Sequence, residues 1–399
     1  MEYFKELLKK PSLFQDESKL DINYVPDKLP HRHKELSLLS QLFLNLITHP
    51  NSISRKILIT GKIGIGKTVT LKLFGEILEE ASEKKKVSIK YIHINCRKER
   101  TSYKVLIRII RLLNPNFPKR GYSLQDLLEA LIDLLNKYDL HILIVLDELS
   151  YLINKREDLV YLLTRINDDS FNVQQRISII GIIRDISCLN NLDNSTVSTL
   201  QTNIIKFKDY SKDQIFDILK YRAEISLKKN IISEKIIHMI SEMNLLNGDI
   251  RYGLNLLWRA CKIAEYKGLK FITPECVRLG TQEMLPYSTL DILKYMSTQK
   301  LSFLLAIVKA LKKNEDYTIS FLESLKLYNI ICENIGLKPR SYSQLWNYLQ
   351  EFKNENIILV KLLSEKIKGR RALIEIPEIY LPKIEKCIID LLISKGIQI

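Results

Sequence analysis

The sequence of 399 residues lacks three features that mark other classes of protein. It has no run of 18 or more apolar residues, so it offers no candidate transmembrane helix. Its first residues, Met1–Glu6, do not begin a secretory signal. The six cysteines are scattered without a Cys-x-x-Cys pair, which argues against a zinc site or a disulfide framework. The sequence therefore predicts a cytoplasmic protein with no membrane partner.

Acidic residues are also fewer than basic ones, with 46 aspartates and glutamates and 61 lysines and arginines. The resulting net charge of +15 favours a polyanionic partner, although a generally lysine-rich composition would give the same value. The length predicts two or three domains, and a hydrophobic content of 46% is enough to build their cores. The position of the charge must decide whether nucleic acid is the partner.

Glycine is scarce, with 13 residues, yet three of them fall in one octapeptide. The octapeptide fits the phosphate-loop pattern G-x-x-x-x-G-K-[ST] and consists of Gly61, Lys62, Ile63, Gly64, Ile65, Gly66, Lys67 and Thr68. A β-branched run, 56–60, precedes it, and helical spacing continues from Val69. Backbone N–H groups of such a loop surround phosphates at a helix N-terminus. We expect Lys67 to reach the β/γ oxygens of ATP or ADP and Thr68 to bind Mg²⁺.

A second element carries acidic residues at the end of an apolar run. Residues 141–146 predict a buried strand, and Asp147 and Glu148 follow it directly. In a doubly wound sheet we expect this strand to lie beside the phosphate-loop strand and to open on the nucleotide crevice. Asp147 would hold Mg²⁺ through water, and Glu148 would orient and polarise the attacking water.

One further motif has a structural interpretation. Residues 136–139 match the N-K-x-D pattern with which GTPases read guanine, but they precede the acidic strand instead of following it. We interpret them as the end of a helix and the connection to that strand.

A third apolar run, 177–183, ends at Arg184, where AAA+ ATPases usually have a polar sensor residue between the two nucleotide motifs. Further on, 247–257 begins a helix with Arg251 in its first turn. An arginine on a helical lid can contact the γ-phosphate and distinguish ATP from ADP. On spacing alone, Arg251 could equally be a surface residue of an amphipathic helix.

The pattern changes after residue 300 to a small helical unit with a basic hairpin. Helices are predicted at 301–311, 321–335 and 340–350, followed by strands at 356–362 and 372–376. This order is that of a winged helix, whose third helix can enter a major groove and whose wing can contact phosphates or a minor groove. The candidate DNA contacts are Arg340, Ser341, Tyr342, Ser343 and Gln344 on the helix, and Lys366, Lys368, Arg370 and Arg371 on the loop 364–371. Leu345, Trp346 and Leu349 are predicted to be core.

Together these pieces resemble one family, the archaeal origin-recognition, cell-division-control type of AAA+ replication initiator. The resemblance covers nearly the whole chain and includes an N-terminal box at 21–32, the segments 61–68, 147–148, 248–251 and 255–260, and the C-terminal 343–346. It implies that the box packs around adenine, through Tyr24, Val25, Pro26, His31 and Arg32. It also implies a helical insertion, 103–121, that contacts DNA beside the winged helix, through Lys119 and Arg120.

Two positions depart from the family pattern. Arg184 stands where the family usually has Asn, and Leu192–Thr196 stands where it usually has D-P-R, which supplies an arginine finger to a neighbouring subunit. Ser195 cannot stabilise a transferring phosphoryl group in a neighbour's site. Arg184 would bring a cation near the γ-phosphate while disturbing the placement of water. We therefore expect tight nucleotide binding and slow hydrolysis.

The sequence predicts an α/β P-loop AAA+ ATPase base at 1–204, an α-helical lid at 205–290 and a C-terminal winged-helix (α+β) domain at 291–399. By resemblance it would be nucleoid-associated and bind double-stranded origin DNA, paralogous initiator subunits and the replicative minichromosome-maintenance helicase. A winged-helix transcription regulator gated by nucleotide, or a mobile-element DNA-binding ATPase, would share the same motifs. The sequence does not separate these alternatives.

Overall fold

The computed structural model describes residues 12–50, 52–153, 159, 162–163, 175–192, 197, 200, 203–282, 292–314, 318–355, 357–364, 370–376 and 381–397. The chain divides into two compact units: one is Pro11–Asn255, and the other includes Leu256–Ile399. The division falls within the helix α11 (Ile250–Tyr266), so one helix contributes to both units. The domain boundaries predicted near residues 204 and 290 stay predictions.

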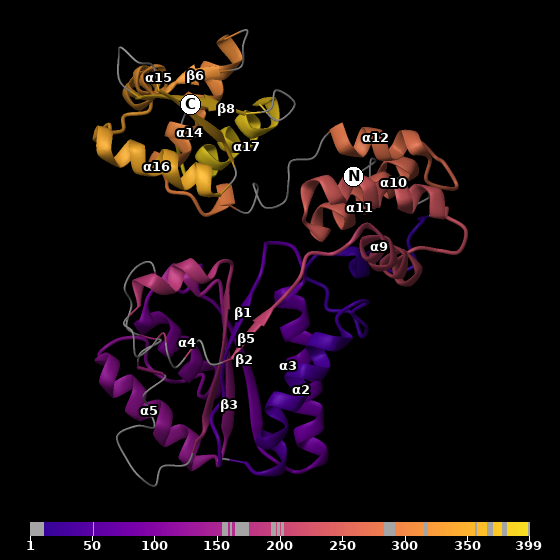
Figure 1. The fold of residues 1–399 in the computed structure, drawn as a ribbon, viewed down its shortest axis with the longest axis vertical. Helices are drawn as coiled ribbons and strands as arrows, with labels where there is room; N and C mark the ends of the chain where they lie inside the picture. The colour runs from indigo at the N-terminus through magenta and orange to yellow at the C-terminus, as the bar shows by residue number, and fades with distance from the viewer. Residues whose placement is uncertain are drawn as a thin grey trace. The chain divides into compact units, whose positions relative to one another are not determined.

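A parallel sheet forms the centre of the first unit (Figure 1). Its strands are β1 (Lys56–Thr60), β2 (Ile89–Asn95), β3 (His141–Asp147), β4 (Ile177–Ile183) and β5 (Ile204–Lys206). Every residue of β3 and β4 is buried, which is why both strands appear in the sequence as unbroken apolar runs. The strands predicted at 56–60, 141–146 and 177–183 are confirmed.

The order of the strands corrects one prediction. The sheet runs β2-β3-β4-β1-β5, so β4 separates the acidic strand β3 from the phosphate-loop strand β1. β1 pairs with β4 from Lys56↔Ile179 to Thr60↔Ile183, and β4 pairs with β3 on its other side. A run of apolar residues shows that a strand is buried, but the packing of the crossover helices decides which strands are neighbours. The three strands still end at the same edge, because all are parallel.

Helices cover both faces of this sheet (Figure 1). α2 (His33–Thr48) and α3 (Lys67–Lys84) pack on one face, where Phe43 and Phe74 lie with ring centroids 5.6 Å apart. The other face is covered by α4 (Ser102–Leu113), α5 (Leu124–Lys137) and the short α6 (Ser150–Ile153). These helices bury apolar stripes against the strands, which leaves the carboxyl edge of the sheet for polar side chains.

The end of α5 confirms the interpretation of the N-K-x-D segment. Asn136 and Asp139 receive hydrogen bonds from the Arg176 guanidinium at 3.0 and 2.7 Å, just before β4 begins. Asp139 has a positive φ of 45°, and β3 starts two residues later. The segment is a helix end held to the neighbouring strand.

The predicted lid helices are confirmed as α9 (Lys212–Ser226), α10 (Glu234–Asn247) and the start of α11. A capping box between Ser211 and Gln214 starts α9. Gly248, with φ of 67°, ends α10 in the left-handed conformation that glycine adopts without strain. The short helices η1 (Glu17–Leu20) and η2 (Ile186–Asn191) complete this unit, and α12 (Pro274–Gln282) belongs to the other.

The second unit contains a winged helix (Figure 1). Its elements are α14 (Thr298–Lys313), β6 (Thr318–Ser320), α15 (Phe321–Asn334), α16 (Tyr342–Asn354), β7 (Leu359–Ser364), β8 (Arg370–Glu375) and α17 (Leu381–Ser394). The antiparallel strands are ordered β6-β8-β7. Phe303 on the buried α14 contacts the rings of Phe321, Tyr328 and Phe352 and so joins three helices.

Three details of the winged helix differ from the sequence prediction. The third helix begins at Tyr342, so Arg340 and Ser341 precede it. Arg370 and Arg371 lie in β8, paired with Ser364 and Leu363, and not in the loop. β6 and α17 were not predicted. Short strands and terminal helices carry little periodicity, and strand pairing extended this hairpin beyond its apolar residues.

No helix in the part of the chain that the structure describes is long and apolar enough to cross a membrane.

Candidate nucleotide and nucleic-acid sites

The phosphate loop connects β1 to α3 and depends on glycine at three positions. Gly61, Gly64 and Gly66 have φ of 147°, 76° and 88°, in the region that other residues adopt only with strain. A Cβ on Gly61 would lie 2.5 Å from Ile65, and one on Gly66 would lie 2.7 Å from the Tyr210 hydroxyl. Only glycine therefore allows the loop backbone to pack this closely against its neighbours. The N–H groups of the loop lie at the start of α3, where a phosphate can accept hydrogen bonds from them.

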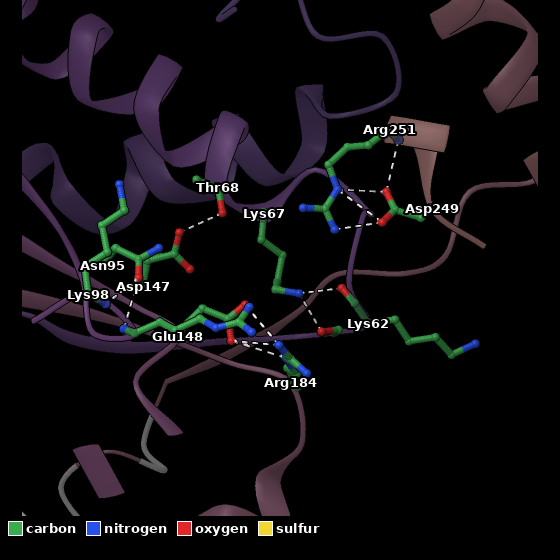
Figure 2. A network of polar contacts seen from close by, with 12 residues as sticks. Lys62, Lys67, Thr68, Asn95, Lys98, Asp147, Glu148, Arg184, Asp249 and Arg251 are labelled. Atoms are coloured by element: carbon green, nitrogen blue, oxygen red, sulfur yellow. Dashed lines mark hydrogen bonds and ion pairs between the residues drawn. The ribbon is translucent and has the colours of Figure 1, made fainter. Parts of the chain in front are cut away.

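Lys67 is the first residue of α3, and its ammonium turns back into the loop (Figure 2). Nζ donates to the carbonyl oxygens of Gly61 at 2.6 Å and Lys62 at 2.5 Å. Burial lowers the pKa of Lys67 to about 8, although the charges of Glu148 and Asp147 act to raise it. A cation held in this desolvated position suits a phosphate group, which would replace the lost hydration.

Thr68 and Asp147 meet from different elements. The Thr68 hydroxyl donates to Oδ2 of Asp147 at 2.8 Å, joining α3 to the end of β3 (Figure 2). Burial on its own would raise the pKa of Asp147, but hydrogen bonds from His93 and Thr68 outweigh it and the pKa lies below its ordinary value. A hydroxyl beside an ionised carboxylate is a donor set that fits Mg²⁺, which prefers oxygen ligands and keeps several waters.

Glu148 lies one residue further and is paired with Arg184. Its Oε2 receives a hydrogen bond from Arg184 Nε at 3.2 Å, and the guanidinium also approaches Oε1 (Figure 2). Each side chain keeps about a quarter of its surface exposed, 25% and 26%. Glu148 has a φ of 57°, so the chain turns sharply here from β3 toward α6. The predicted catalytic carboxylate and the residue at the sensor position thus form one ion pair.

The start of the lid touches the phosphate loop. The Ile250 N–H donates to the Gly64 carbonyl at 3.2 Å, and a Cβ on Gly64 would lie 2.0 Å from Oδ1 of Asp249. Asp249 in turn receives hydrogen bonds from the Arg251 guanidinium, the shortest at 2.7 Å (Figure 2). Arg251 therefore lies at the start of α11, paired with the residue that contacts the loop, and its sensor role stays a prediction.

The N-terminal box packs against both the loop and the lid helix α9. Arg32 is 4% exposed, and its guanidinium donates to the Ile65 carbonyl at 2.7 Å and to Tyr210 at 2.9 Å. His31 Nε2 lies 2.7 Å from Oδ2 of Asp217 on α9. Arg222 of α9 covers the ring of Tyr24 at 5.3 Å. The box therefore lies beside the phosphate loop and α9, and its contact with adenine stays a prediction.

Sequence reasoning missed one polar row beside this site. Tyr91, His93 and Asn95 alternate with buried isoleucines along β2, and His93 Nε2 lies 3.1 Å from Oδ2 of Asp147. It also missed Tyr210, whose partly buried ring lies 4.1 Å from the guanidinium of Arg32. The period-two alternation in 89–95 was a readable signal for the first set. Nothing in the sequence pattern indicated Tyr210.

The predicted DNA-binding residues lie in separate elements. Lys119 and Arg120 are exposed on the turn between α4 and α5, which the stacked rings of Phe117 and Tyr122 support at 4.9 Å. Arg340, Ser341, Tyr342, Ser343 and Gln344 are exposed at the start of α16. Leu345 and Leu349 are buried and Trp346 packs against Phe321, which confirms that they are core. Lys366, Lys368 and Ser195 lie outside the described residues.

These features define a class of protein. A parallel sheet ordered β2-β3-β4-β1-β5 with a phosphate loop, an acidic strand end and a helical lid is the AAA+ ATPase fold, here combined with a winged helix. Residues 54–184 match the AAA domain, 216–282 match the Cdc6 AAA+ ATPase-type lid domain, and 291–378 match the CDC6 C-terminal winged helix domain.

The chain belongs to the family of ORC1-type DNA replication proteins. It is 31% identical to the ORC1-type DNA replication protein 2 of Sulfurisphaera tokodaii, over 93% of this chain and 91% of that one. It is 30% identical to the Pyrococcus furiosus ORC1-type DNA replication protein, over 92% and 88%. The structure of the Aeropyrum pernix ORC1 protein in complex with DNA is similar with a TM-score of 0.80, at 25% identity and with 96% and 98% of the two chains covered.

Proposed function

We propose that this chain is a replication initiator that binds ATP or ADP with Mg²⁺ and uses the nucleotide state to control its engagement of double-stranded origin DNA. The observation that carries the proposal is the contact of Asp249 and Ile250 with Gly64, because it couples the phosphate loop to the first turn of α11. A phosphate held by the loop would compete with the Gly64 carbonyl and the Asp249 carboxylate for two donors of the lid, the Ile250 N–H and the Arg251 guanidinium. The position of the lid would then control how the chain engages double-stranded origin DNA.

Each side chain at the carboxyl edge has a distinct task. Lys67 supplies a desolvated positive charge for the β/γ oxygens, and Arg251 supplies a second one from the lid. Thr68 and Asp147 hold the metal, the latter through water. Mg²⁺ supplies charge neutralisation at the phosphates when it is bound. Glu148 orients and polarises the attacking water once it is released from Arg184.

Slow hydrolysis by the isolated chain is part of this proposal. The carboxylate that must accept a hydrogen bond from water is engaged by the Arg184 guanidinium. The same guanidinium carries a charge that favours a bound triphosphate. Arg184 therefore favours nucleotide binding and slows nucleotide cleavage.

DNA binding rests on the winged helix and on charge. The first turn of α16 is exposed and polar, and Arg370 and Arg371 belong to the basic hairpin. The Aeropyrum pernix ORC1 relative was solved with DNA, which supports the same role here. We further propose that Lys119 and Arg120 provide a second contact and that paralogous initiators and the replicative minichromosome-maintenance helicase are the protein partners.

Genome-wide occupancy followed by footprinting tests the proposal. We expect footprints at repeated elements of a replication origin that are strengthened or weakened when ATP replaces ADP. Footprints confined to promoter operators would instead identify a transcription regulator, and binding confined to mobile elements would identify a mobile-element ATPase. Either outcome contradicts the proposed function.

A combined variant tests the wing. Replacing Lys366, Lys368, Arg370 and Arg371 with alanine should weaken DNA binding and reduce the slope of log affinity against log salt by about one for each lost phosphate contact. Lys84 and Lys85, on and just after α3, provide a charge-matched control when paired with Lys267 and Lys270. Unchanged affinity in the wing variant would show that the assignment is wrong.

A further inference from the structure

His93 lies on β2, next to the acidic strand β3. Along β2, Ile92 and Ile94 are buried in the core with α4 and α5, whereas Tyr91, His93 and Asn95 face the other way. The register pairs His93 with Val145 and Asn95 with Asp147. The position of His93 in the register is therefore two residues before that of Asp147, on the same face of the sheet, and within reach of its carboxylate.

The imidazole of His93 has a polar partner on each side. Nε2 lies 3.1 Å from Oδ2 of Asp147, the same oxygen that accepts the Thr68 hydroxyl at 2.8 Å. Nδ1 lies 2.9 Å from the Tyr91 hydroxyl. The side chain of His93 is 16% exposed and that of Asp147 is 7% exposed, so solvent does little to weaken these bonds.

The chemistry of the partners fixes the direction of the first bond. An ionised carboxylate only accepts hydrogen bonds, so Nε2 carries the proton and donates to Asp147. In the neutral imidazole Nδ1 is then the acceptor, and the Tyr91 hydroxyl can donate to it. Tyr91 therefore donates to His93, and His93 donates to the Asp147 carboxylate, which accepts.

Tyr91 is held rigidly by α3. The Tyr91 N–H donates to Oε1 of Glu79 at 2.9 Å, and its ring lies over Gly75, where an added Cβ would be 2.5 Å from the ring. A glycine in the middle of a helix costs stability, and here it allows the aromatic ring to approach the helix backbone. The phosphate-loop helix thus braces the histidine that contacts Asp147.

We propose that His93 is a positioning residue that orients the Asp147 carboxylate for the divalent cation bound with the nucleotide. This inference rests on the proposed nucleotide site. Asp147 reaches the metal only through water, so its two oxygens must be oriented by the protein. Thr68 can keep its hydrogen bond to Oδ2 while its lone pairs turn to the metal, and His93 holds the same oxygen from the neighbouring strand β2.

The test measures nucleotide binding as a function of Mg²⁺ concentration. A fluorescent ATP analogue is titrated with the wild type, His93→Ala, His93→Gln and Tyr91→Phe, in EDTA and in rising Mg²⁺. We expect His93→Ala to raise the half-saturating Mg²⁺ concentration about tenfold, the low end for loss of a group that orients a metal ligand. His93→Gln keeps an N–H at the same reach and should restore most of the loss. Tyr91→Phe should give a smaller shift in the same direction.

The controls separate a positioning role from a structural one. His49→Ala removes an exposed histidine that follows α2 and should leave the Mg²⁺ dependence unchanged. Binding in EDTA should be equal in all variants, because it does not involve Asp147. An equal loss in EDTA and Mg²⁺, or wild-type Mg²⁺ dependence in His93→Ala, would overturn the proposal for His93. Absence of nucleotide binding by the wild type would instead overturn the proposed function on which it rests.

Discussion

Glu148 and Arg184 follow neighbouring parallel strands, and their side chains meet because those strands end at one edge of the sheet. The pair is only partly buried, so its attraction is screened and worth about 1 kcal/mol at most. That energy is small compared with the stability of a domain, and it corresponds to a change of about fivefold in a rate. The main effect of the pair is therefore to keep Glu148 from orienting the attacking water.

Arg184→Asn should release Glu148 and increase single-turnover ATP hydrolysis by up to about fivefold, the equivalent of about 1 kcal/mol. The affinity for ATP should fall, because a cation near the γ-phosphate is lost. Quenched-flow measurement of product, with binding measured separately, checks both effects. A slower single-turnover rate would show that Arg184 assists cleavage.

His141 gives a prediction for stability against pH. Burial, together with the charge of Arg176, lowers its pKa from 6.5 to about 4, and Nε2 lies 3.0 Å from the Ser178 hydroxyl. Between pH 6.5 and about 4 the unfolded chain binds a proton that the folded chain does not. The free energy of unfolding should therefore fall across this interval as the pH decreases, by up to about 3 kcal/mol from this one group.

Urea unfolding of the wild type and His141→Gln between pH 7 and 4.5 measures the effect. The variant should lose most of the slope that His141 contributes, whatever its stability at pH 7. His49→Ala provides the control, because His49 is exposed after α2. Parallel curves for the wild type and His141→Gln would contradict the prediction.

At the scale of elements, the phosphate loop and the start of α11 form one unit of structure. Gly64 is the point of contact, with φ of 76° and its Cβ direction blocked by Asp249. Gly121 has a similar φ of 99°, but no atom lies within 4 Å of its Cβ position. The two glycines therefore differ in packing and not in backbone requirement.

Gly64→Ala should displace the beginning of the lid as well as strain the loop. We expect it to lower the free energy of unfolding by about 1 kcal/mol or more beyond Gly121→Ala, which carries only the strain of 1 to 2 kcal/mol. Nucleotide affinity should fall in Gly64→Ala and stay at the wild-type value in Gly121→Ala. Thermal unfolding and nucleotide titration measure both, and equal behaviour of the two variants would refute the coupling.

Elements with strong periodicity were predicted correctly, and those defined by pairing were not. Residues 177–183 form β4 as expected, since an apolar β-branched run has few alternatives. The position of β4 between β3 and β1 was missed, because neighbours in a sheet are chosen by the packing of distant helices. Arg370 and Arg371 were expected in a loop for a similar reason: pairing with β7 draws charged residues into β8.

At the scale of the whole molecule, this chain is expected to depend on other subunits for hydrolysis. The segment Leu192–Thr196 offers no arginine where the family usually supplies a finger, so we do not expect a second copy to complete the first copy's site.

Hydrolysis by the isolated chain should stay slow and independent of its concentration. Ser195→Arg should introduce a concentration-dependent increase of at least about tenfold, well below the 10³ to 10⁵ of an optimised finger. Mixing the wild type with a paralogous initiator that carries its own arginine should have the same effect. Single-turnover assays on DNA check the prediction, and rapid hydrolysis by the wild type alone would contradict it.

Local sequence patterns were enough to predict the chemistry: a phosphate loop, paired acids after a buried strand, a basic winged helix and an arginine in the first turn of a lid helix. These signals are local, because a motif needs only its own residues and the period of the element that carries it. Which residues from distant parts of the chain contact one another became visible only in the folded structure. Arg184 against Glu148, His93 against Asp147 and Asp249 against Gly64 join residues 36, 54 and 185 positions apart. Such contacts depend on strand order and helix packing, which no short pattern encodes.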